Sequence, residues 1–156
     1  MSKRRGVLAV LAVSLTSLGT ANMASAEGRN GSHCRESILR SSLPRWARGG
    51  FVGGNPPYVF GQHARIVAVL FRPLSVDPQA SRSNKILWVS RPKLTHPDDL
   101  LINGRNLSTN ETVKLKVAGG PGPSTIDVPS PGCWRLNLTW SGHSDSIDLQ
   151  WRPRGG

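Results

Sequence analysis

Apolar and polar side chains alternate along much of the chain, which is typical of β-strands that have one face in water. The alternation is regular at residues 113–117, 134–140 and 147–151, where every second side chain is Val, Leu, Ile or Trp. Residues 65–71 and 85–89 are instead apolar at nearly every position, which predicts central strands covered on both faces. These segments indicate a protein built mainly from antiparallel sheets.

Three shorter apolar segments, at residues 58–60, 100–102 and 125–128, predict further strands. A helical pattern is confined to a short turn at Glu36–Leu43. Seven or eight short strands predict an all-β fold, an immunoglobulin-like antiparallel β-sandwich, with a small β-barrel as the alternative. Turn-forming residues separate the segments at Gly49-Gly50, Gly53–Pro57, Asp77-Pro78, His96–Asp99, Asn103-Gly104, Gly119–Pro123 and Ser141–Ser144.

The N-terminus has the order of a secretory signal peptide. Cationic residues 3–5 precede an apolar run at residues 7–13, and small residues follow up to Ala26. We expect cleavage between Ala26 and Glu27 and export by the general secretory route or, given the paired arginines, by the twin-arginine route. The apolar run is shorter than the roughly 20 residues that a membrane span needs, and no candidate span follows it.

Four parts are therefore expected: a signal peptide (1–26), a basic N-terminal arm (27–50), a β-sandwich domain (51–152) and a tail (153–156). The first 26 residues hold three of the 20 Lys and Arg residues and none of the nine Asp and Glu residues, so residues 27–156 have a formal net charge of +8. A basic surface favours anionic partners, and we expect an anionic cell-wall polymer or another envelope protein and no nucleic acid. The alternative is that the charge serves solubility alone.

Cys34 and Cys133 are an even pair in a chain with an export signal, which predicts a disulfide. Because Cys34 precedes the first predicted strand, the bond would hold the arm to a late strand and would not join the two sheets. Cys133 has no histidine or lysine beside it to favour the thiolate, which argues against a reactive thiol.

Residues with catalytic or metal-binding potential are few. Residues 142–146 begin like the G-x-S-x-G motif of hydrolases, with Ser144 as the nucleophile, but a strand follows where that motif needs a helix. The four histidines have no metal-ligand spacing, so no catalytic residue, metal or cofactor is predicted. A hydrolase that uses Ser144 and a protease-inhibitor-like module that presents Pro121–Ser124 are kept as alternatives.

Trp46 differs from the other four tryptophans, which occupy apolar strand positions and are expected in the core. It lies in the basic arm, where an exposed indole could stack on a sugar ring or anchor in a partner's pocket. The alternative is that it folds back and covers one end of the sandwich. The predicted binding residues are Arg40, Arg45, Trp46 and Arg48, and the predicted function is a secreted, non-enzymatic binding module.

Several sequence strings carry a family resemblance. Residues 43–47 (LPRWA), 83–89 (SNKILWV) and 131–136 (PGCWRL), together with Val69–Phe71 and Gly122–Ser124, resemble a group of uncharacterised secreted proteins of actinobacteria and related Gram-positive bacteria. The likeness covers most of residues 27–156. It implies export from such a cell and supplies no activity or functional residue.

Overall fold

The computed structural model describes residues 34–49, 54–76 and 83–153. The predicted signal peptide and its cleavage site lie outside these residues. The described part is all-β, apart from one turn of 3-10 helix. Its elements are η1 (Arg45–Ala47), β1 (Tyr58–Phe60), β2 (Ile66–Leu70), β3 (Lys85–Ser90), β4 (Leu100–Asn106), β5 (Thr112–Val117), β6 (Pro123–Thr125), β7 (Gly132–Trp140) and β8 (His143–Trp151).

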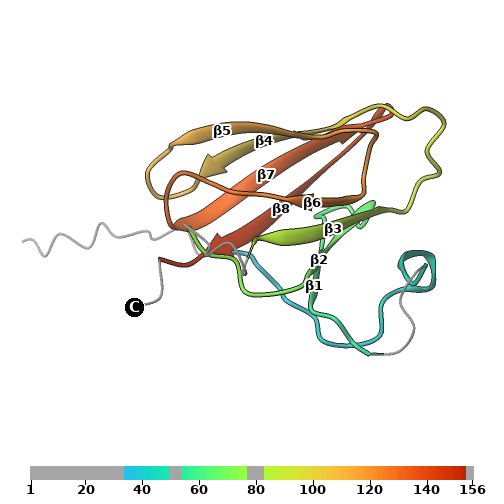
Figure 1. Ribbon diagram of the computed structural model, residues 1–156, viewed down its shortest axis with the longest axis horizontal. Helices are drawn as coiled ribbons and strands as arrows, with labels where there is room; N and C mark the ends of the chain where they lie inside the picture. Colours follow the sequence, from blue (N-terminus) through green and yellow to red (C-terminus); the bar gives the residue numbers. More distant parts are fainter. Residues whose placement is uncertain (1–33, 50–53, 77–82, 154–156) are drawn as a thin grey trace, which may run out of the picture. The chain divides into compact units, whose positions relative to one another are not determined.

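The strands form two four-stranded sheets, with the orders β1-β2-β3-β6 and β5-β4-β7-β8, and all neighbours are antiparallel (Figure 1). Pairing of β3 with β6 in one sheet and of β4 with β7 in the other is the connectivity of an immunoglobulin-like sandwich. Inward side chains of both sheets share one core, which includes Trp88, Trp134, Trp140 and Trp151. The predicted fold class is therefore confirmed. No helix in the described ranges is long and apolar enough to cross a membrane.

Strand β2 is buried at all five positions because both of its faces are covered. Ile66, Ala68 and Leu70 point into the core between the sheets. Val67 and Val69 belong to a second apolar cluster, to which the arm contributes buried residues. The continuous apolar run thus reflects a strand covered by the second sheet on one side and by the arm on the other.

The arm (residues 34–49) is fixed to both sheets. A disulfide joins Cys34 to Cys133 of β7, with the two Cα atoms 5.3 Å apart. Two residues on, Glu36 accepts a hydrogen bond from the backbone N–H of Gln150 in β8. Leu39 then forms a β-bridge with Tyr58 of β1. The arm therefore connects the β8 edge of one sheet to the β1 edge of the other, and the predicted disulfide is confirmed.

Two local predictions from the sequence were wrong. The helical turn lies at η1, whereas residues 36–43 are non-helical and contact β1 through the single bridge of Leu39 with Tyr58. The Asn103-Gly104 pair is no turn but lies inside β4. Gly104 is required there because a Cβ would come within 2.8 Å of Val113 Cγ1 and 3.1 Å of Leu136 Cδ2. This glycine serves close packing across the sheet, which sequence alone does not distinguish from a turn.

The sixth strand begins at Pro123, two residues earlier than residues 125–128 would predict, and ends at Thr125. The backbone N–H of Trp88 donates to the carbonyl of Gly122, and the backbone N–H of Ile126 donates to the carbonyl of Asn84, which directly precedes β3. Because an antiparallel ladder bonds at every second residue, its bonds fall on residues 122, 124 and 126. The backbone nitrogen of Pro123 falls between those bonds and faces away from β3. A proline is tolerated at such a position of an edge strand.

Candidate binding site

The four predicted binding residues do not form one site. Arg45, Trp46 and Arg48 lie on or next to η1, where Arg45 and Arg48 are exposed and Trp46 is half-buried. The Trp46 ring packs 6.3 Å from the ring of Phe60, on the outer face of the first sheet. Arg40 lies before η1 in the arm and lines a separate hollow. Whether Trp46 contacts a partner stays a prediction.

A second group of side chains lies together on the outer face of the first sheet. Alternation along β2 places Val67, Val69 and the next outward residue, Phe71, on this face. The arm covers the two valines, whereas Phe71 remains 50% exposed. Its backbone N–H donates to the carbonyl of Lys85, which pairs in turn with Thr125. An aromatic ring directly after β2, a cation of β3 and a hydroxyl of β6 thus form one row.

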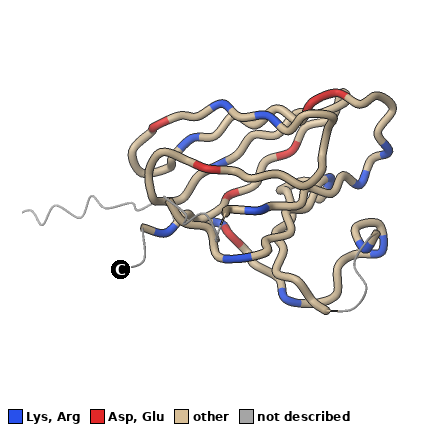
Figure 2. Tube along the Cα trace, in the orientation of Figure 1, with Lys and Arg blue, Asp and Glu red and all other residues tan. Residues whose placement is uncertain are grey.

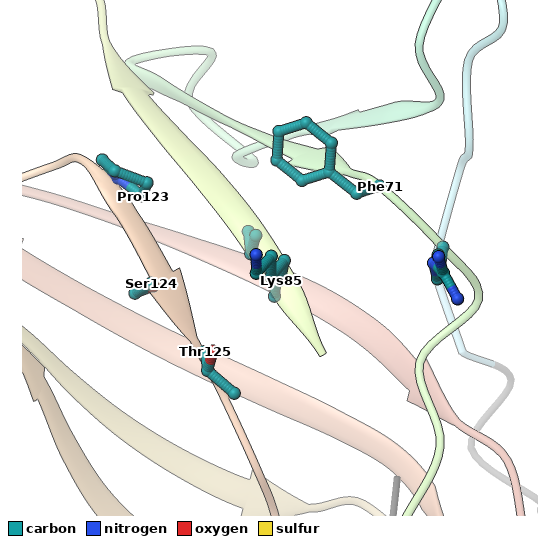
Figure 3. A pocket seen from close by; sticks show the side chains of 7 residues that line it. Phe71, Lys85, Pro123, Ser124 and Thr125 are labelled. Atoms are coloured by element: carbon teal, nitrogen blue, oxygen red, sulfur yellow. The ribbon is translucent and has the colours of Figure 1, made fainter. Parts of the chain in front are cut away.

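This row borders a hollow of about 680 Å³, which is also lined by Arg72, Ile86, Pro123 and Ser124. Figure 3 shows the ring of Phe71 and the side chains of Lys85, Pro123 and Thr125 around the same open space. The volume falls within the roughly 300–1,000 Å³ that small-ligand sites occupy. Ser124 pairs with the core residue Ile86 and accepts the indole N–H of Trp88 at 3.0 Å, so it faces the core side of β6. The hydroxyl on the outer face is that of Thr125, which pairs with Lys85.

A second hollow, of about 250 Å³, adjoins the first and shares Phe71 and Arg72 with it. Its opposite wall is the arm, which contributes Ile38 and Arg40. We call the two hollows together the Phe71 cleft. The charged side chains that line the cleft are four cations and one carboxylate: Arg40, Arg72, Lys85, Arg152 and Glu36.

Lysine and arginine are spread over both sheets and the arm (Figure 2). Several of those on the second sheet have a partner. Lys116 pairs with Asp99 at 2.9 Å, which with the Gly119 amide lowers the pKa of that carboxyl. Arg135 forms two bonds of 2.8 Å with Asp148. Among the described residues no carboxylate forms an ion pair within 4.0 Å with the cations of the Phe71 cleft. Arg152 interacts electrostatically with Glu36 at longer range, so Arg40, Arg72 and Lys85 are the cations whose charge is available to a ligand.

Glu36 is the one acid of the cleft, and burial raises its pKa above the ordinary 4.5, against the opposing effects of the Gln150 amide and Arg152. A raised folded-state pKa means that the protonated form contributes stability below the ordinary pKa, and this contribution is lost as the pH rises through the folded value. The ionised carboxylate of Glu36 therefore lowers the free energy of unfolding relative to its protonated form.

We expect the stability of the wild type relative to Glu36→Gln to fall as the pH rises from below 4.5 to neutrality, because only the wild type has this carboxyl to ionise. Urea unfolding of both proteins at pH 4 and pH 7 measures the difference, and the other carboxylates cancel in the comparison. Equal pH dependence of the two proteins would contradict the burial of this group.

Ser144, the alternative nucleophile, is exposed on β8. The neighbouring Asp145 carboxylate is buried and accepts the backbone N–H groups of His63, Arg65 and Ser146. It also lies 3.3 Å from Nδ1 of His63. Within the described ranges no hydrogen bond links Ser144 Oγ to a histidine. The alternative inhibitory loop, Pro121–Ser124, has its last two residues in β6.

Four residues of the cleft were not predicted from the sequence: Phe71, Arg72, Lys85 and Arg152. One signal was present: outward alternation along the second strand ends on a bulky aromatic followed directly by arginine. The other residues come from separate strands and from the C-terminal segment, and only the sheet register brings them together.

Comparisons with protein-family models, with curated proteins and with solved structures found no match for this chain. The class of protein is therefore defined by its own geometry. It is an immunoglobulin-like sandwich with a disulfide-anchored arm and a basic cleft that extends from the outer face of the first sheet to the arm and the end of β8.

Proposed function

We propose that this protein is a secreted, non-enzymatic binding module that holds an anionic polymer of the cell envelope in the Phe71 cleft. The observation that carries the proposal is the charge of the cleft, where four cations face a single carboxylate. Cations that line a concave surface focus the electrostatic field and favour association with polyanions. Export is supported by the N-terminal signal pattern and by the disulfide, because disulfides persist in oxidising compartments outside the cytoplasm.

A polymer suits this site better than a small ion does. The two hollows adjoin each other, so a chain could pass Lys85 and Arg72 in the first and reach Arg40 in the second. Several weak contacts of this kind, each of about 0.2–1 kcal/mol at an exposed site, add up along a repeating ligand.

The test is retention of the purified protein on Gram-positive cell walls at increasing salt, before and after extraction of the anionic wall polymers. We expect retention that weakens steeply with salt, because exposed charge pairs are screened. Replacing Arg72 and Lys85 together by glutamine should weaken apparent affinity about three- to tenfold, since two exposed charge contacts are lost.

Two double variants with the same loss of charge serve as controls. Lys93→Gln with Lys114→Gln alters exposed lysines away from the cleft and should leave retention nearly unchanged. Arg45→Gln with Arg48→Gln tests the arm site predicted from the sequence. Salt-insensitive retention would contradict the proposal. If retention is equal on extracted walls and is abolished by protease treatment of the walls, the partner is an envelope protein and not the polymer. Release of shortened polymer would indicate a hydrolase.

A further inference from the structure

We infer that the Phe71 end of the cleft is a subsite for an acidic saccharide, in which a sugar ring stacks on Phe71 and its carboxylate or phosphate binds Lys85 and Arg72. This inference rests on the proposed function and names the repeating unit that the polymer would contain. The juxtaposition that carries it is the row Phe71–Lys85–Thr125, at the border of the larger hollow.

Phe71 is the exposed end of an apolar stripe that the arm leaves uncovered. The arm packs on Val67 and Val69, yet Phe71 keeps half of its surface in water. The ring of Pro123 lines the same hollow (Figure 3). An aromatic ring bordered by apolar surface provides a platform for the C–H face of a sugar, which is flat and apolar on one side.

The polar groups beside this platform match the edge of such a ring. Lys85 and Arg72 are exposed and supply positive charge for an acidic substituent. The Thr125 side chain is also exposed and can exchange hydrogen bonds with a sugar hydroxyl. Neutral sugars would use the platform and the hydroxyl alone, so the acidic sugar is the better fit.

A nucleic-acid base could also stack on Phe71, but two features favour the saccharide. The disulfide suits an oxidising compartment, where envelope glycans are abundant. The described part of the cleft also contains a single aromatic side chain, whereas single-stranded nucleic acid is usually held by several stacked bases on successive aromatic rings.

The experiment compares three probes by calorimetric titration: tetragalacturonate, tetraglutamate of the same charge, and oligothymidylate of four nucleotides. We expect Phe71→Ala to weaken tetragalacturonate binding about three- to tenfold, because ring stacking is lost, and to leave tetraglutamate within twofold. Phe71→Tyr should restore the affinity, because a ring remains. Leu94→Ala removes another exposed apolar side chain, 44% exposed on the segment between β3 and β4, and should change nothing.

Equal weakening of both acidic probes by Phe71→Ala, or no weakening of either, would overturn the saccharide subsite. Tighter binding of oligothymidylate than of tetragalacturonate would overturn it as well. The double variant Arg72→Gln with Lys85→Gln separates this failure from that of the proposed function. If the double variant weakens the binding of both acidic probes and Phe71→Ala weakens neither, the cleft binds polyanions without a ring subsite. If the double variant changes the binding of neither probe, the proposed function itself fails.

Discussion

Replacing both cysteines by alanine is expected to lower the free energy of unfolding by about 4–5 kcal/mol, because the disulfide no longer constrains the unfolded chain. The two cysteines are 99 positions apart in the sequence, and the entropy that such a bond removes from the unfolded chain increases with loop length. The native contacts of the arm remain available without the bond, so the protein should still fold. Urea unfolding of Cys34→Ala with Cys133→Ala against the oxidised wild type measures the loss.

The reduced wild type is the matched control, because it has the same sequence as the oxidised protein and lacks only the bond. It should resemble the alanine variant to within about 1 kcal/mol, the size of an ordinary point substitution. A difference below about 1 kcal/mol between the oxidised protein and both of the others would show that the bond does not constrain the unfolded chain.

Asp145→Ala is expected to lower the free energy of unfolding by about 3–5 kcal/mol, because buried donors left without an acceptor cost about 1–3 kcal/mol each. The carboxylate has a side chain with 0% exposure and accepts three backbone N–H groups, at 2.8 to 2.9 Å. Two of these amides, from His63 and Arg65, belong to the turn between β1 and β2. One side chain of β8 therefore holds a turn of the opposite sheet.

Gly61 shows how closely this turn approaches the carboxylate, since a Cβ there would lie 2.2 Å from Asp145 Oδ2. The matched control is Ser144→Ala, one residue away on the same strand but exposed, which should stay within about 0.5 kcal/mol of the wild type. Thermal and urea unfolding compare the two variants. A loss from Asp145→Ala below about 1 kcal/mol would mean that water or the relaxed turn satisfies the freed amides.

Much of the fold could be predicted because alternation and turn residues are local signals. The period-two pattern predicted β5, β7 and the end of β8, and the even cysteine pair predicted the disulfide. The apolar run of β2 was predicted to be covered on both faces, but what covers it was not. Val67 and Val69 are buried by an arm that lies more than 15 residues away in sequence, and its path depends on tertiary contacts.

The candidate site was less predictable because its residues are brought together by the pairing register of the strands. Phe71 directly follows β2, whereas Lys85 and Thr125 lie in β3 and β6. The three become neighbours only once these strands pair. The arginines of the arm were prominent in the sequence because they are close together along the chain. In the folded protein Arg40 lines the cleft, whereas Arg45 and Arg48 lie at η1.

The most direct test of the account is an NMR titration of the ¹⁵N-labelled protein with tetragalacturonate at low salt. Binding in the Phe71 cleft should shift the backbone amide signals of Phe71, Arg72, Lys85 and Thr125, and added salt should reverse the shifts. Signals from β5, on the second sheet, should not move. Shifts confined to residues 45–48, or no shifts at millimolar probe, would contradict the assignment of the cleft as the binding site.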